Sequence, residues 1–180
     1  PEPGHGFKIR GYLGGGFWKR AYRASSDFHT ADVALLYFRD ESRNDIIRKD
    51  VENLILVTKE SEYSTYLAKF HGIQYGDDGK LFIVEELMER PLDRLSPIND
   101  LVLFSRIARD LCRGLSCLHN NGLVHRDFKL DNCGLDHLRK AKIFDLGSAT
   151  SEPGGIEGTI LTRAPELFDC CDEHTPNPIT

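Results

Sequence analysis

The chain has 180 residues, of which 40% are hydrophobic and 28% are charged, and its formal net charge is −5. This composition is typical of a globular domain with one sizeable core and excludes a disordered chain. The negative charge gives no general attraction to nucleic acid or anionic lipid, and no apolar run approaches the roughly 18 residues of a membrane span. We therefore expect a soluble protein that binds neither nucleic acid nor membranes.

The five cysteines include no CxxC pair, and their odd number argues against a complete disulfide framework. A reducing, intracellular and cytoplasmic setting is therefore expected. Cys112 and Cys117 lie five residues apart in a helical pattern, which favours small buried side chains over a metal site. The first residues lack an initiator methionine and the last ones are polar and rich in proline, so both ends are expected to be cuts or gene-model edges.

The first half of the chain is expected to form a small antiparallel sheet with one helix. Apolar residues near helical spacing predict the helix over residues 44–58. The predicted strands are short runs rich in β-branched and aromatic residues, separated by turn residues, at 7–10, 21–24, 32–38, 68–74 and 81–87.

The second half begins with a long amphipathic helix over residues 99–119, whose apolar residues recur on one face. Residues 120–122, Asn-Asn-Gly, are expected to end this helix with a left-handed cap. From Leu123 onward the pattern predicts short extended pieces joined by loops, including residues 142–144 just before Asp145.

Three polar motifs follow the long helix. The first is an octet at residues 125–132 with the sequence His-Arg-Asp-Phe-Lys-Leu-Asp-Asn. The second is Asp-Leu-Gly at residues 145–147, which begins thirteen residues after Asn132 and follows an apolar strand. The third, at residues 158–166, reads Gly-Thr-Ile-Leu-Thr-Arg-Ala-Pro-Glu. Any one of these residues fits an ordinary polar turn, but the whole octet does not.

These motifs resemble those of eukaryotic-type protein kinases: the octet is similar to the HRDxKxxN catalytic loop, and Asp-Leu-Gly to the D-F-G element. The resemblance implies that Asp127 orients the attacking hydroxyl and accepts its proton, and that Lys129 is a cation on the γ-phosphate of ATP. Asn132 and Asp145 are implied as ligands of Mg²⁺, the ion that bridges the ATP phosphates.

The third motif resembles the GTxxYxAPE end of the kinase activation segment, with Thr162 in the place of the usual tyrosine. Thr159 and Lys129 match the serine/threonine enzymes, so the expected substrates are serine and threonine hydroxyls of a protein. Small-molecule phosphotransferases lack such a segment. Several hydroxyl side chains within residues 145–166 are candidate phosphorylation sites, and the sequence does not decide among them. Arg126 is the side chain that would pair with the added phosphate.

The nucleotide loop near the start of the chain departs from the family pattern. A glycine-rich turn at residues 13–22 resembles the kinase loop GxGxxGxV, in which Gly14, Gly15 and Gly16 would let backbone amides approach phosphate. Lys19 occupies the place of the third glycine.

A second departure lies in the third strand, where residues 33–36, Val-Ala-Leu-Leu, align with the V-A-I-K motif. Ala34 is expected to contact ATP, but Leu36 stands where the phosphate-binding lysine belongs. Without that cation, the negative charge of the triphosphate would be poorly compensated. The two departures together resemble the with-no-lysine kinases, and this resemblance implies that Lys19 takes over the missing role.

Two residues of the predicted helix are candidates for the carboxylate that would hold Lys19, and the sequence does not decide between them. Asp50 has the phase of the usual glutamate but is one methylene shorter, whereas Glu52 has the right side chain in the wrong phase. For either residue, a solvated helix face is the ordinary alternative.

The run at residues 81–88 resembles the last N-lobe strand entering the hinge, where the backbone of Glu86 and Met88 would bind adenine. This alignment puts Glu85 at the back of the nucleotide pocket, where an apolar residue or threonine is usual. A carboxylate in that position requires a partner or a raised pKa.

The resemblance covers roughly residues 7 to 170 and implies an α+β, two-lobed protein-kinase-like fold: a small antiparallel sheet with one helix, and a partial, mainly helical C-lobe. The expected organisation over residues 1–180 is a single partial kinase domain, with an N-lobe at 7–88, a hinge and linker at 89–98 and a truncated C-lobe at 99–180. The expected function is transfer of the γ-phosphoryl group of ATP, with Mg²⁺, to serine or threonine hydroxyls of a protein. The alternative is a pseudokinase or interaction module that binds nucleotide without transfer.

Overall fold

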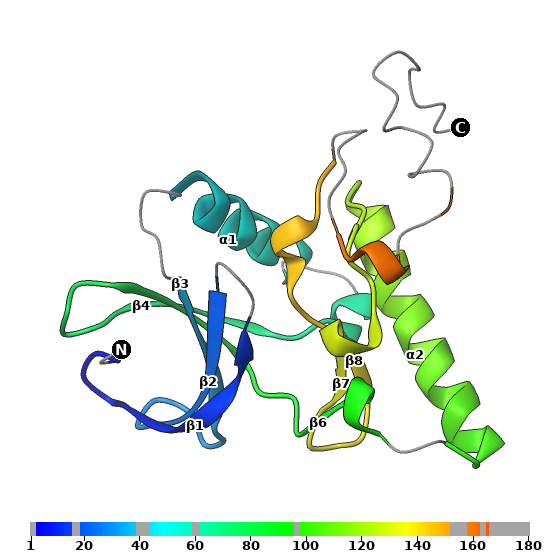
Figure 1. The fold of residues 1–180 in the computed structure, drawn as a ribbon, viewed down its shortest axis with the longest axis horizontal. Helices are drawn as coiled ribbons and strands as arrows, with labels where there is room; N and C mark the ends of the chain where they lie inside the picture. Colours follow the sequence, from blue (N-terminus) through cyan, green and yellow to red (C-terminus); the bar gives the residue numbers. More distant parts are fainter. Residues whose placement is uncertain are drawn as a thin grey trace.

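The computed structural model describes residues 3–15, 19–38, 44–58, 62–95, 98–151, 158–162 and 165. Its larger sheet has five strands, β1 (Phe7–Gly15), β2 (Lys19–Ser26), β3 (Val33–Phe38), β4 (Phe70–Tyr75) and β5 (Leu81–Glu86). They pair antiparallel in the order β1-β2-β3-β5-β4 (Figure 1). The small antiparallel sheet expected from the sequence is confirmed.

Strands β1 and β2 are longer than the runs that the sequence pattern predicts. Their pairing extends from Phe7 opposite Ser26 to Gly15 opposite Arg20. The rings of Tyr12 and Tyr22, which face each other in this register, have centroids 5.5 Å apart. Glycines in the second half of β1 obscure the strand pattern, although Gly11, Gly14 and Gly15 all pair with β2.

The two faces of the larger sheet pack against different apolar groups. On one face Val33, Leu35, Phe82 and Val84 form a separate cluster with Ala24. On the other face the apolar residues of β3 and β5 pack with the helix α1 (Asn44–Thr58) (Figure 1). The bounds of α1 agree with the predicted helix.

The second part of the chain is built on α2 (Leu101–Asn120). The side chain of Asp100 caps its first turn by accepting hydrogen bonds from the amides of Val102 and Leu103 at 2.8 and 3.2 Å. The helix ends before Gly122, whose φ is +71° and whose amide donates to the carbonyl of His119, close to the expected cap. No helix within the described ranges is long and apolar enough to cross a membrane.

A small sheet lies between the larger sheet and α2 in Figure 1. It consists of β6 (Arg90–Pro91), β7 (Cys133–Leu135) and β8 (Ala141–Ile143), in that order. Short 3₁₀ helices complete the described structure at Glu62–Tyr66, Leu92–Arg94, Leu130–Asn132, Leu146–Ser148 and Ile160–Thr162.

One apolar core joins the two parts of the molecule. It contains Leu54 of α1 and Ile83 of β5 together with Leu118 of α2 and Ile143 of β8. The amide of Ala68, just before β4, donates to the carbonyl of Ile143 at 2.8 Å. The elements that carry the predicted site residues are therefore anchored to a common core.

Candidate active site

Lys19 is the first residue of β2, and its side chain reaches toward α1. Its Nζ lies 2.5 Å from Oδ1 of Asp145 and 3.5 Å from Oδ2 of Asp50. Burial alone would lower the pKa of the Lys19 ammonium, but the carboxylates of Asp145 and Asp50 outweigh burial and raise the pKa. Lys19 is therefore a fixed cation between α1 and the Asp-Leu-Gly turn.

The strand register places Lys19 on the face of the sheet where the expected lysine of β3 would lie. Lys19 pairs with Phe38, and the next pair on the same face is Ala21 with Leu36. Leu36, in the usual lysine position, is 7% exposed and belongs to the apolar core. The ammonium thus enters the same face of the sheet from β2.

Of the two candidate partners on α1, Asp50 contacts Lys19 and Glu52 does not. Asp50 is 1% exposed, and burial raises the pKa of its carboxyl although Lys19 opposes the shift. Its Oδ1 finds no hydrogen-bond partner in the part of the chain that the structure describes. Glu52 is exposed and accepts a 2.7 Å hydrogen bond from Arg48, one turn earlier.

Asp145 lies in the left-handed backbone region, with a φ of +61°. Burial opposes ionisation, but Lys19 lowers the pKa of the Asp145 carboxyl below its ordinary value. Its neighbour Phe144 donates its amide to the carbonyl of Asn132 at 2.9 Å, and the Phe144 carbonyl lies 3.4 Å from Nε2 of His125. These contacts join the Asp-Leu-Gly turn to the octet.

The carboxylate of Asp127 is surrounded by four donor contacts. Its Oδ1 accepts from the amide and the hydroxyl of Thr159, both at 2.7 Å, and its Oδ2 lies 3.0 Å from Nδ2 of Asn132 and 2.9 Å from Nζ of Lys129. Lys129 also donates to the Thr159 hydroxyl at 2.6 Å. Burial alone would raise the pKa of the Asp127 carboxyl, but the contacts with Lys129 and Thr159 outweigh burial and lower it. Asp127 is therefore ionised at neutral pH.

Gly158 lets the segment after it approach the octet. Its φ is +95°, and a Cβ at this position would lie 2.2 Å from the carbonyl oxygen of Arg126. Only glycine fits there, so Thr159 can reach Asp127. Arg126, the expected partner of a phosphorylated hydroxyl, donates from Nε to the carbonyl of Ser148 at 2.9 Å.

The two described glycines of the glycine-rich segment lie opposite the start of β2, next to Lys19. Gly14 and Gly15 pair with Ala21 and Arg20 at the ends of β1 and β2. A Cβ at Gly15 would lie 2.5 Å from the carbonyl oxygen of Lys19, so the hairpin requires glycine there. Gly16, the third predicted phosphate-binding glycine, lies outside the described residues.

The residues expected around adenine lie on β3, at the end of β5 and beside β7. Ala34 pairs with Glu85 across β3 and β5. Glu86 ends β5, and Met88 lies so close to Gly134 of β7 that an added Cβ would be 2.7 Å from the Met88 Cβ. Ala34 thus lies beside the end of β5 that carries Glu86, and Met88 lies beside β7.

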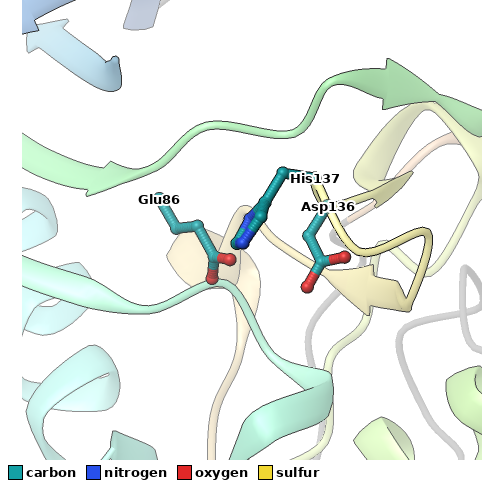
Figure 2. A group of neighbouring side chains, drawn as sticks. All are labelled: Glu86, Asp136 and His137. Atoms are coloured by element: carbon teal, nitrogen blue, oxygen red, sulfur yellow. The ribbon is translucent and has the colours of Figure 1, made fainter. Parts of the chain in front are cut away.

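The side chain of Glu86 takes part in a polar cluster with Asp136 and His137, shown in Figure 2. One ligand atom from each of the three lies within 4.8 Å of the others. Lys142 of β8 already occupies this cluster, with its Nζ 2.7 Å from both carboxylate oxygens of Glu86 and 3.3 Å from Oδ2 of Asp136. We therefore assign it as an ion-pair clamp between β5 and β8 and not as a metal site.

Comparison with known proteins decides the family. A family model described as "Protein kinase domain" matches residues 7–177. The chain belongs to the protein kinase family. The kinase family and the two-lobed kinase fold expected from the motifs are therefore confirmed.

Several curated relatives of this kinase domain carry the name "Dual serine/threonine and tyrosine protein kinase". The Gallus gallus protein is 41% identical over 112 residues, which is 57% of this chain and 12% of that protein. The Xenopus tropicalis and Homo sapiens proteins are 52% and 50% identical over 66 residues, which is 35% of this chain and 7% of each protein. The chain thus spans only a small fraction of the length of these relatives.

Within this kinase domain, contacts connect the catalytic residues proposed from the sequence. Lys19 reaches Asp145, and Asn132 bridges the Asp145 segment to Asp127 and Lys129. The end of the third motif, including Glu166, lies outside the described residues.

Sequence reasoning missed two contacts of the site. Thr159 was singled out for substrate class, but nothing in the sequence indicated that it hydrogen-bonds Asp127 across 32 positions. The clamp of Lys142 on Glu86 was also missed. Its only signal was a lysine inside a short apolar strand, which is buried together with its neighbours.

Proposed function

We propose that this chain forms the nucleotide-binding and catalytic part of an enzyme that transfers the γ-phosphoryl group of ATP to serine and threonine hydroxyls of proteins. The supporting observation is the contact series from Lys19 through Asp145 and Asn132 to Asp127. Phosphoryl transfer needs cations on the phosphates and a carboxylate on the attacking hydroxyl, and this series carries both.

The residues present fit Mg²⁺, which prefers hard oxygen ligands. The Asp145 carboxylate is kept ionised by Lys19, as a metal ligand must be. The side-chain nitrogen of Asn132 donates to the carbonyl of Asp127 at 2.8 Å, which leaves the amide oxygen as the ligand atom. Mg²⁺ held by Asp145 and Asn132 would neutralise charge on the ATP phosphates.

The remaining groups position the substrates and handle the proton. Asp127, ionised at neutral pH, orients the substrate hydroxyl and accepts its proton. Lys129 is held 2.9 Å from Asp127 and carries positive charge to the γ-phosphoryl group. Lys19 supplies the cation for the other phosphates in place of Leu36. Because these charges are already fixed, they stabilise the developing negative charge without reorganisation.

The contact of Lys129 with the Thr159 hydroxyl supports serine and threonine as acceptors, because this pair is the feature that matches serine/threonine enzymes. The names of the curated relatives include tyrosine, so tyrosine acceptors belong in the test. The free thiols of Cys112, Cys117 and Cys133 fit a reducing, cytoplasmic compartment.

The proposal is tested by Mg²⁺-dependent transfer from γ-labelled ATP to protein substrates, followed by phosphoamino-acid analysis. Asp127→Asn should reduce transfer by about 10²-fold or more because it removes the proton acceptor. Asp131→Asn, which changes an exposed aspartate of the same loop, is the matched control and should retain transfer. ATP binding without transfer in the parent protein would favour the pseudokinase alternative, and labelled tyrosine would widen the acceptor class.

A further inference from the structure

Glu85 faces the same side of the sheet as the catalytic lysine. Along β5, Phe82 and Val84 point into the cluster on the opposite face, so Ile83 and Glu85 point toward α1. The register agrees, because Glu85 is opposite Ala34 and Ile83 is opposite Leu36. Glu85 thus lies directly beside Ala34, on the face that carries Lys19.

The side chain of Glu85 is buried, and its carboxyl group has no direct partner among the residues that the structure describes. The residue is 4% exposed, and its neighbours Lys19, Asp50 and Asp145 form no hydrogen bond or close ion pair with it. Burying a carboxyl group without a hydrogen-bond partner is unfavourable, and a ligand that supplies a partner would offset part of this cost. Lys19, Asp50 and Asp145 act on Glu85 only through longer-range electrostatics.

The protonation of Glu85 determines which ligand can complete it. Burial raises the pKa of this carboxyl to about 8; Lys19 opposes the shift, and Asp50 and Asp145 add to it. At neutral pH the group is therefore mainly a neutral acid, with one O–H donor and one carbonyl acceptor side by side. Such a pair is complementary to a ligand edge that carries one donor and one acceptor.

Adenine has such an edge, formed by its exocyclic amine and N7. Asparagine and glutamine recognise this edge by paired hydrogen bonds, and a neutral carboxylic acid offers the same pattern. Guanine presents two acceptors there, O6 and N7, so one acceptor would face the carbonyl of the acid. If Ala34, Glu86 and Met88 surround the base, as the proposed function requires, Glu85 lies next to this edge.

We propose that Glu85 is a base-selecting residue, whose buried carboxyl group pairs with the exocyclic amine and N7 of adenine and favours ATP over GTP. This inference rests on the proposed function, because it assumes that a nucleotide occupies the site. Glu85 thereby takes on a recognition role in a position that usually carries an apolar residue or threonine.

The test is the dissociation constant of Mg²⁺ complexes of ATP, GTP and 7-deaza-ATP, measured by isothermal titration calorimetry. Three proteins are compared: the parent, Glu85→Leu and Glu85→Gln. Leucine removes both hydrogen bonds at similar volume, so its affinity for ATP should fall by about 5- to 100-fold. Its affinity for GTP should change little. Glutamine keeps one donor and one acceptor and should retain the preference of the parent.

The analogue 7-deaza-ATP isolates the N7 contact, because backbone groups near the base can also discriminate between ATP and GTP. The parent and Glu85→Gln should bind ATP more tightly than 7-deaza-ATP, and Glu85→Leu should bind the two equally. Lys19→Met serves as a control that should weaken every nucleotide by the same factor, because it acts on the phosphates.

The outcomes separate this inference from the proposed function. Equal ATP-to-GTP and ATP-to-7-deaza-ATP ratios in the parent and in Glu85→Leu would overturn the role of Glu85 while leaving the nucleotide site intact. Failure of the folded parent to bind any nucleotide would overturn the proposed function and this inference with it. Loss of the preference in both Glu85→Leu and Glu85→Gln would also contradict paired recognition, since glutamine preserves the pattern.

Discussion

Three carboxyl groups interact with the ammonium of Lys19, and two of them, Asp50 and Glu85, are buried. Asp145 and Asp50 contact it directly, whereas Glu85 interacts with it only at longer range. One cation stabilises the carboxylates that it contacts better than a buried one at longer range, so Glu85, which has no direct contact with Lys19, is the group that holds a proton. The ionisation of Glu85 should therefore be visible in the stability of the protein.

Glu85→Gln should change how stability depends on pH. The folded pKa of Glu85, about 8, lies above the ordinary value of 4.5, so the folded state binds the proton more tightly than the unfolded state. The stability that Glu85 contributes is present below about pH 4.5 and is lost as the pH rises toward 8. The variant should therefore gain stability relative to the parent, on the order of 3 kcal/mol, between pH 5 and pH 8.

Urea denaturation at several pH values measures this difference. Glu52→Gln is the matched control, because Glu52 is exposed on α1 and outside the buried group. A difference between Glu85→Gln and the parent that stays constant from pH 5 to pH 8 would show that Glu85 is ionised throughout.

Among the elements, β5 and β8 are held together by the clamp of Glu86, Lys142 and Asp136. Lys142 is largely buried, and it bridges two carboxylates from different parts of the chain. The sequence could not reveal this pairing, because Glu86 and Lys142 are 56 positions apart and a lone lysine in a short strand is usually solvated. Glu86 was expected to act only through its backbone.

Lys142→Met should destabilise the protein by about 3 kcal/mol, because it leaves the buried Asp136 and the partly buried Glu86 without their cation. The double variant Glu86→Leu and Lys142→Met should recover part of this loss, since one of the two carboxylates is then removed. Urea denaturation of the parent, both single variants and the double variant measures the coupling. Strictly additive effects would mean that Glu86 and Lys142 are not coupled in stability.

The segment around Thr159 depends on one glycine. Gly158→Ala would place a methyl group against the carbonyl of Arg126 and displace Thr159 from Asp127. Transfer should fall by about 10- to 100-fold, because small displacements of positioning groups are costly in catalysis. Steady-state kinetics of phosphate transfer measures the effect, with Gly11→Ala as control because an added Cβ there meets no atom within 4 Å. Unchanged kinetics in Gly158→Ala would remove Thr159 from the catalytic arrangement.

For the whole molecule, local sequence patterns predicted the helices and the larger sheet, and the polar motifs predicted the protein kinase family. The helix at residues 44–58 was predicted with its bounds, because its apolar spacing and its polar flanks agree. The full lengths of β1 and β2 could not be predicted, since the glycines that close the hairpin resemble a loop. The contact of Thr159 with Asp127 depends on how distant segments fold onto one core, which sequence spacing does not specify.

The central claim is that residues from distant stretches form one phosphoryl-transfer site whose lysine comes from β2. The most direct measurement is the rate of Mg²⁺-dependent transfer from ATP by three variants: Lys19→Met, Lys8→Met as the exposed control, and the double variant Lys19→Met and Leu36→Lys. Lys19→Met should lose about 10²- to 10³-fold in rate while remaining folded. Lys8→Met should keep the full rate, and the double variant should recover part of it, because Leu36 lies on the same face as Lys19. A full rate in Lys19→Met would contradict the claim.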